Sequence, residues 1–98
     1  MQKIQIFETS EYQRWFEGLR DLAAQMRIGV RLRRVALGNL GDHRSLGGGI
    51  YELRVDHGPG YRVYFAWRQE AAIVLLAAGD KSSQERDIRR ARELARGL

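Results

Sequence analysis

Two neighbouring segments in which polar and apolar residues alternate constrain the fold of this chain most strongly. A β-strand turns successive side chains to opposite faces, so the first segment places Tyr51, Leu53 and Val55 on one face of a sheet. The second segment, residues 61–67, repeats the alternation after a Gly-Pro-Gly turn. In a hairpin, the polar residues that share the other face are Glu52, Arg54, Arg62 and Tyr64. This polar face is a candidate phosphate-binding surface.

The register of this hairpin depends on the length of its loop. Arg54 and Arg62 share a face only if the numbers of paired residues sum to an even value. That register requires an odd number of loop residues, or a bulge, at the turn of residues 57–60. A shift of one residue would bury the charges.

The composition predicts a single domain, residues 1–98, in the cytoplasm. Hydrophobic residues make up 44% of the chain and charged residues 30%, as is usual in a globular protein. The longest apolar run, residues 71–78, is far shorter than the roughly 20 residues of a membrane span, and residues 1–5 form no apolar targeting segment. Without cysteine the chain has no disulfide, thiolate nucleophile or cysteine metal site. We expect no metal, no other cofactor and no membrane contact.

The charge of the chain favours polyanionic partners. Seventeen Lys and Arg residues against twelve Asp and Glu residues give a net charge of +5. Most of these cations are arginine, whose planar fork binds phosphate and carboxylate in a bidentate manner. RNA, DNA and an acidic protein are the partners that fit. The alternative is that a GC-rich genome favours arginine codons, in which case the bias carries no function.

The first third of the chain predicts one strand and two helices. Residues 3–7 alternate as a strand, and Ser10 with Gln13 forms a capping box that begins a short helix. Gly18 breaks that helix, and a basic amphipathic helix follows from Leu19 to about residue 37. The predicted apolar stripe of this second helix consists of Leu22, Ala23, Met26 and Val30.

The remaining elements follow from glycine content and apolar patterning. Residues 38–49 hold five glycines and predict an irregular stretch that folds over a site. Residues 71–78 are apolar on both faces and predict a central strand. Ser82 with Glu85 forms a second capping box before the last helix. The apolar stripe of that helix is Ile88, Ala91, Leu94 and Ala95, and its other face is charged.

Four sequence blocks resemble one family of bacterial toxins. The blocks are Gly38-Asn39-Leu40-Gly41-Asp42, Gly49-Ile50-Tyr51-Glu52-Leu53-Arg54, Gly58-Pro59-Gly60-Tyr61-Arg62-Val63-Tyr64-Phe65 and Gly79-Asp80-Lys81-Ser82-Ser83-Gln84. Their order and spacing over nearly the whole chain are similar to the RelE/ParE superfamily, in the phage-related addiction module killer protein branch close to HigB-type toxins. The resemblance implies an α+β fold of order β-α-α-β-β-β-α. Its small, curved, mainly antiparallel sheet would have two N-terminal helices and one C-terminal helix.

The resemblance also implies a function as the toxin of a type II toxin-antitoxin module. Catalytic members cut mRNA in the ribosomal A site without a metal, and an antitoxin encoded beside the toxin, usually a helix-turn-helix protein, silences it. The leading hypothesis is therefore a ribosome-dependent mRNA endonuclease. Members of the ParE type instead poison DNA gyrase, so a gyrase inhibitor is the second hypothesis and a degenerate antitoxin-binding module is the third. Under all three, we expect an acidic or amphipathic antitoxin segment to cover the basic surface.

The polar face supplies the candidate catalytic residues. Arg54 and Arg62, on rigid strands, can place several N–H donors around a charged phosphate transition state; the alternative is a surface salt bridge with Glu52. Glu52 would be a weak base among arginines, and orienting Arg54 is its favoured role. Lys81, at the end of the central strand, is a candidate to bind phosphate or to lower the pKa of a neighbouring group; the alternative is simple exposure at the start of the last helix. Tyr64 is a candidate to stack on a base or to donate a proton; the alternative is a half-buried tyrosine of the sheet.

Other residues are candidates for RNA contact or for the core. His43 and His57 lie in predicted loops and are candidates for acid or base, with a solvated surface position as the alternative. The residues expected to bind RNA are Arg27, Arg31, Arg34, Arg44, His43 and His57. The aromatic residues expected in the core are Trp15, Phe16, Phe65 and Trp67.

Overall fold

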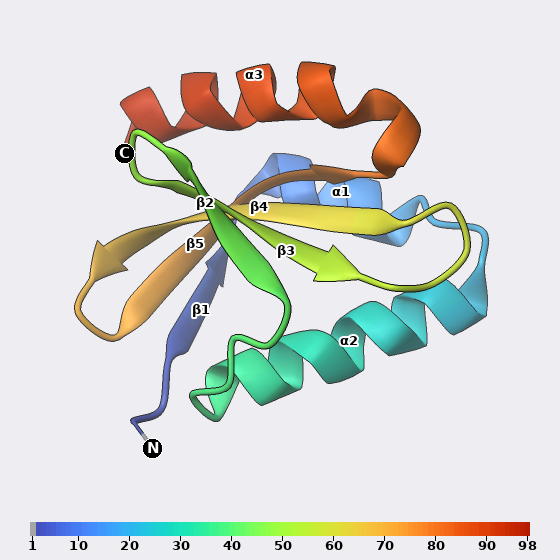
Figure 1. Cartoon of the computed structure of the whole chain (residues 1–98), viewed down its shortest axis with the longest axis horizontal. Helices are drawn as coiled ribbons and strands as arrows, with labels where there is room; N and C mark the ends of the chain where they lie inside the picture. The colour runs from blue at the N-terminus through green and yellow to red at the C-terminus, as the bar shows by residue number, and fades with distance from the viewer. Residues whose placement is uncertain (1) are drawn as a thin grey trace.

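A computed structural model describes residues 2–98 and contains five strands, three α-helices and one short 3-10 helix (Figure 1). The elements in chain order are β1 (Gln5–Glu8), α1 (Ser10–Glu17), α2 (Leu22–Ala36), β2 (His43–Gly47), β3 (Ile50–Val55), β4 (Tyr61–Gln69), β5 (Ala72–Gly79), η1 (Lys81–Ser83) and α3 (Gln84–Arg96). The expected α+β class, with two N-terminal helices and a C-terminal helix, is confirmed. Within the described residues, no helix combines the length and the apolar character needed to cross a bilayer.

The five strands form one sheet in the order β1-β5-β4-β3-β2. β1 runs parallel to β5, and the other neighbouring strands are antiparallel. Side chains of α1 and α2 pack on one face of the sheet, and α3 packs on the other. Figure 1 shows α2 and α3 on opposite sides of the twisted sheet. The polar residues of β3 and β4 lie on the face that α3 partly covers.

Strand β2 corrects the expected order of elements. The sequence predicts an irregular stretch at residues 38–49, whereas residues 43–47 pair with β3 at the edge of the sheet. Gly47, Gly48 and Gly49 have φ values of 86°, 65° and 83°, which favour glycine and let the chain reverse between the two strands. The order is therefore β-α-α-β-β-β-β-α, because the glycines that suggested a loop form a hairpin turn.

The predicted register of the β3–β4 hairpin is confirmed. Arg54 pairs with Arg62, and Glu52 pairs with Tyr64. The loop contains residues 56–60, an odd number, as the even sum of paired residues requires. Every residue of β5 is buried, which confirms the expected central strand.

The cores on the two faces account for most of the aromatic residues. Phe65 is buried beneath α1 and α2, and Trp15 and Phe16 pack against the same cluster. Trp67 is 36% exposed, so its assignment to the core was wrong. Trp67 lies near the end of β4, where the helices no longer cover the strand.

Both predicted capping boxes are misplaced. Thr9, not Ser10, is the N-cap of α1, and its Oγ1 accepts a hydrogen bond from the Tyr12 amide at 3.1 Å. The box at Ser82 is replaced by one in which Asp80 and Ser83 cap η1. In both cases a neighbouring side chain with the same capping chemistry takes the position. The predicted break at Gly18 and the predicted apolar stripe of α3 are confirmed.

Helix α2 turns a different face inward than its sequence pattern predicts. It begins after the N-cap Asp21 rather than at Leu19. The residues that pack on the sheet are Ala24, Ile28 and Val35. The predicted stripe was wrong, since Leu22 and Met26 are 71% and 72% exposed.

Candidate functional site

Four elements converge on one buried carboxylate on the polar face of the sheet. Glu52 of β3 is 0% exposed. Its Oε1 accepts a hydrogen bond from Arg44 Nε of β2 at 3.1 Å, and its Oε2 accepts one from Gln84 Nε2 of α3 at 2.9 Å. Arg62 Nε of β4 lies 3.5 Å from Oε2. We call Glu52, Arg44, Arg62 and Gln84 the Glu52 cluster.

Arg62 is the member of the Glu52 cluster with unused hydrogen-bond donors. Its side chain is 15% exposed. Among the described residues, Nε and Nη1 are buried and have no hydrogen-bond acceptor. The contact of Nε with Glu52, at 3.5 Å, is longer than a good hydrogen bond. A buried cation with unpaired donors is costly unless an acceptor reaches it. The site is therefore suited to an anion.

Arg54 faces Arg62 across the strands but has a different carboxylate partner. Arg54 Nη2 and Nε lie 3.0 Å and 3.2 Å from Asp42 Oδ1. The prediction that Glu52 orients Arg54 was wrong. Side chains directly opposite on neighbouring strands are closer than side chains two residues apart on one strand. Arg44 and Tyr64 are the cross-strand neighbours of Glu52, whereas Asp42 precedes β2 beside Arg54.

Tyr64 lies beneath α3 and does not reach the surface. Its side chain is 0% exposed, and its hydroxyl has no hydrogen-bond partner among the described residues. Burial, together with the negative charge of Glu52, raises the pKa of the Tyr64 phenol well above its ordinary value. The prediction that Tyr64 stacks on a base was wrong for this arrangement, because α3 covers the ring.

Lys81 is exposed at the end of the sheet where β5 leads into η1. Arg62 pairs with Gly79, two residues before Lys81. The Cβ of Lys81 lies 3.8 Å from the position that a Cβ would take on Gly60, in the β3–β4 loop. The structure therefore places Lys81 at the same end of the sheet as Arg54 and Arg62, as the sequence predicts.

Neither histidine belongs to the Glu52 cluster. His43 is exposed on β2, and its Nδ1 lies 2.8 Å from the Gly41 carbonyl oxygen. His57 Nε2 lies 3.2 Å from Asp21 Oδ2, and the imidazole stacks on Tyr61. His57 thus links the β3–β4 loop to the start of α2.

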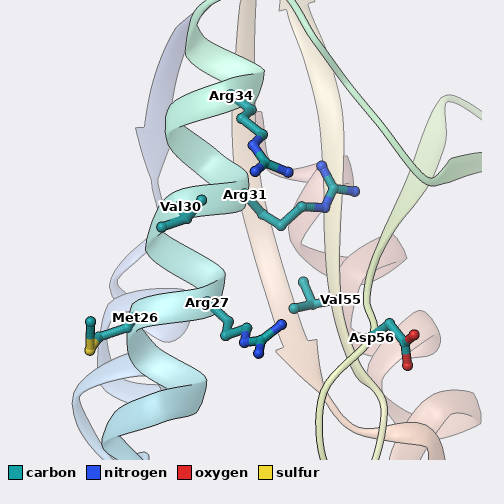
Figure 2. Close-up of a pocket in the computed structure, with 7 residues that line it drawn as sticks. All are labelled: Met26, Arg27, Val30, Arg31, Arg34, Val55 and Asp56. Carbon is teal, nitrogen blue, oxygen red and sulfur yellow. The ribbon is translucent and has the colours of Figure 1, made fainter.

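The arginines of α2 form a second basic region on the other side of the sheet. Figure 2 shows Arg27, Arg31 and Arg34 extending from α2 toward the β3–β4 hairpin. These three arginines line a hollow of about 390 Å³. Arg27 and Arg34 are exposed, whereas Arg31 is partly buried.

Arg31 is bound to backbone carbonyl groups. Its Nη1 donates to the Leu40 carbonyl at 2.9 Å, and its Nη2 donates to those of Asp42 and Arg54 at 2.9 Å and 3.3 Å. Burial lowers the pKa of the Arg31 guanidinium, which still stays charged at neutral pH. Arg31 therefore ties the segment before β2 to β3.

Asp42 and Gln84 are site residues that the sequence reasoning missed. Both lie in the blocks that carry the family resemblance. A reading of the three glycines at 47–49 as a hairpin turn would have paired Arg44 with Glu52 and brought Asp42 beside Arg54. No group of three His, Asp or Glu side chains within residues 2–98 could hold a metal ion.

Comparisons with known proteins place most of the chain in one family. The family model described as "Phage derived protein Gp49-like (DUF891)" matches residues 14–96 and so includes the whole Glu52 cluster. A protein of Haemophilus influenzae, described as an uncharacterized protein, is 43% identical over 95 residues. That similarity covers 97% of this chain and 96% of the relative.

Proposed function

Because this chain belongs to the phage-derived Gp49-like family, which is associated with toxin-antitoxin modules, we propose that it is the toxin of such a module and cleaves mRNA on the ribosome. The observation that carries this proposal is the environment of Arg62. The largely buried guanidinium of Arg62 keeps two donors that have no acceptor among the described residues, on a face that also carries Arg54. The phosphate of an RNA chain supplies the missing acceptor oxygens.

The proposed reaction uses the RNA as its own nucleophile. The ribose 2′-OH loses its proton to solvent water and its oxygen forms a bond to phosphorus. The bond from phosphorus to the 5′ oxygen breaks, and that oxygen takes a proton from water, which leaves a 2′,3′-cyclic phosphate and a 5′-OH. Negative charge grows on the phosphate oxygens between these events. Arg62 and Arg54 donate hydrogen bonds to those oxygens, and Lys81 adds positive charge at the same end of the sheet. Preorganised donors of this kind contribute a few kcal/mol each to the transition state.

Glu52 acts in this proposal as a positioning residue. Its two oxygens accept hydrogen bonds from Arg44 and Gln84 and face Arg62, so the carboxylate holds these side chains in place. Proton transfer is assigned to neither histidine, because both lie outside the Glu52 cluster. The sheet face supplies positioning and electrostatic stabilisation.

The remaining basic residues fit contact with ribosomal RNA. Arg27, Arg34 and Arg44 are exposed and can neutralise phosphates without reading sequence. Arg31 and His57 would support this surface indirectly, by holding the segment before β2 and the β3–β4 loop. A toxin that acts on translating ribosomes works in the cytoplasm, and we propose that location for this chain. Its proposed silencing partner is an antitoxin encoded beside it, of the helix-turn-helix type.

A second candidate function is inhibition of DNA gyrase by binding alone. The position of both histidines away from Arg62 favours it, since a binding toxin needs no acid or base. A degenerate module that only binds the antitoxin fits the same observation.

The test is to map mRNA 5′ ends shortly after induction of the wild-type chain, of Arg62→Ala and of Arg68→Ala. Arg68 is a matched control, because it is an exposed arginine of the same strand. We expect new ends within translated frames for wild type and Arg68→Ala. Loss of Arg62 should reduce them roughly 100- to 1,000-fold, the usual effect of removing one transition-state donor.

Growth arrest without new ends would contradict the nuclease proposal and favour gyrase. Equal cleavage by Arg62→Ala would remove the catalytic role of Arg62 and leave the toxin proposal in place.

A further inference from the structure

Helix α2 carries a second apolar stripe that the protein itself does not cover. Leu22, Met26 and Val30 are 71%, 72% and 40% exposed, and Leu37, at the end of the helix, is 56% exposed. At about 100° per residue, these four side chains fall within an arc of about 80°. We call Leu22, Met26, Val30 and Leu37 the outer stripe.

The outer stripe lies opposite the face that packs on the sheet. Ala24, Ile28 and Val35 are each 0% exposed and form the inner face of α2. An amphipathic surface helix normally presents polar residues on its outer face. A row of exposed apolar side chains on that face is typical of a surface that binds another protein.

Charge on α2 restricts what can cover the outer stripe. Residues 22–36 include Arg27, Arg31, Arg33 and Arg34 and no acidic residue. Figure 2 shows Arg27 and Arg34 on one side of the helix while Met26 and Val30 point to the other. A complementary partner therefore has an apolar stripe flanked by carboxylates.

Two other occupants fit less well. A second copy of the chain would bring the arginines of two α2 helices together, and like charges in contact oppose binding. RNA would neutralise Arg27 and Arg34 but would leave Leu22 and Met26 in water. Gly29 also favours a protein partner. A Cβ at this position would have no neighbour within 4 Å, so the space beside Gly29 is open and lets the backbone of a partner approach α2 closely.

We propose that an acidic amphipathic helix of the antitoxin docks along α2 on the outer stripe and pairs its carboxylates with Arg27 and Arg34. This proposal rests on the proposed function for the identity of the partner. The outer stripe lies on the opposite side of the sheet from Arg62. The antitoxin would then neutralise the toxin by occupying α2, and Arg62 would stay uncovered.

The experiment uses residues 1–98 and, as the probe, the purified protein encoded beside this chain. Isothermal titration calorimetry compares wild type, Met26→Glu, Arg62→Ala and Leu98→Glu. Leu98 is the matched control, since it is an exposed apolar residue outside α2. Thermal melts verify that each variant folds, which we expect because Met26 contributes little to the core.

We expect Met26→Glu to weaken binding at least about tenfold, because it places a charge in an apolar contact and faces acidic residues. Arg62→Ala and Leu98→Glu should bind as wild type does. In cells, Met26→Glu should stay toxic and resist neutralisation by the probe.

The docking proposal is overturned if Met26→Glu binds the probe as wild type does, if the probe does not bind wild type, or if wild type forms a dimer that Met26→Glu dissociates. Loss of toxicity in the folded Met26→Glu variant would also overturn it, since the outer stripe would then contact the target. If binding follows the prediction but wild type is not toxic, the proposed function fails and the docking surface stands.

Discussion

Arg31 and Arg62 are both largely enclosed guanidinium groups, and they lie on opposite sides of the same sheet. Arg31 donates to three backbone carbonyls and thereby joins α2, the segment before β2 and β3. Arg62 has one long ion pair with Glu52 and, among residues 2–98, two buried nitrogens without an acceptor. The described residues therefore satisfy the first guanidinium and leave the second with unpaired donors.

The contrast separates a structural arginine from one available for binding. Buried donors that are already paired add rigidity, and breaking them costs stability. Buried donors that are unpaired lower stability and raise affinity for an acceptor. The composition of the sequence does not distinguish Arg31 from Arg62.

The largest effect should come from Glu52→Ala, which removes the carboxylate that holds Arg62. A buried charge left without its partner typically costs about 3–5 kcal/mol, so we expect the free energy of unfolding to fall by that amount. Urea titration followed by circular dichroism measures the loss.

Asp42→Ala is the matched control for Glu52→Ala. The pair of Asp42 and Arg54 is exposed, so its loss should cost at most about 1 kcal/mol. Equal losses for the two variants would mean that burial of Glu52 does not strengthen its hold on Arg62.

Arg31→Met should lower stability by about 1.5–3 kcal/mol, because the apolar stem is kept while hydrogen bonds from a charged donor are lost. Amide hydrogen exchange at Arg54, whose N–H donates to the Asp42 carbonyl, should speed up. RNA cleavage by the folded variant should change far less than in Arg62→Ala. If Arg31→Met stays folded and loses as much cleavage as Arg62→Ala does, the assignment of a purely structural role to Arg31 is wrong.

Tyr64→Phe tests another buried group that has no hydrogen-bond partner among the described residues. Removing an unpaired hydroxyl should be neutral or stabilise the fold by up to about 1 kcal/mol. Thermal melts and 5′-end mapping together measure the result. A clear destabilisation would show that the hydroxyl has a hydrogen-bond partner, and a selective loss of cleavage would give it a role in the reaction.

The smallest effect concerns the exposed link between α2 and the β3–β4 loop. The pKa of Asp21 lies below its ordinary value of 3.8, first because the Ala24 amide donates to the carboxylate and then because His57 does. Because the pKa of Asp21 is lower in the folded state, its ionised carboxylate adds to the free energy of unfolding. This contribution is complete above pH 3.8 and is lost as the pH falls through the folded-state pKa. Asp21→Asn should therefore differ from wild type at neutral pH and approach it in acid.

Urea midpoints measured from about pH 6 to about pH 2 test this pH dependence. Asp56→Asn is the control, because Asp56 is an exposed carboxylate in the β3–β4 loop, which also holds His57. A difference between Asp21→Asn and wild type that is constant over this range would contradict the assignment.

Local pairing was predictable from the sequence, and long-range pairing was not. The even sum of residue numbers places Arg54 opposite Arg62, because the loop between them is short and the alternation is clear. The partners of Glu52 come from β2 and α3, and Gln84 is far away in the chain. Nothing in a periodic pattern specifies such a contact.

Helix α2 illustrates a different limit of sequence patterns. It carries one apolar stripe through Leu22 and Met26 and another through Ala24, Ile28 and Val35. Periodicity detects both stripes and cannot choose between them. In the folded chain, small Ala24 and β-branched residues face the sheet, and this orientation also brings Arg31 to its carbonyl partners.

The parallel pair of β1 and β5 has a consequence for the order in which the molecule can form. Gln5 pairs with Ala72, and the Thr9 hydroxyl lies 2.9 Å from the carbonyl oxygens of Leu75 and Leu76. Such distant contacts carry a loop-closure cost and form late in folding. Gln84 is made later still, so neither the sheet nor the Glu52 cluster can be completed until most of the chain has been synthesised. If the protein acts on the ribosome as proposed, an unfinished copy would therefore be inactive toward the ribosome that is making it.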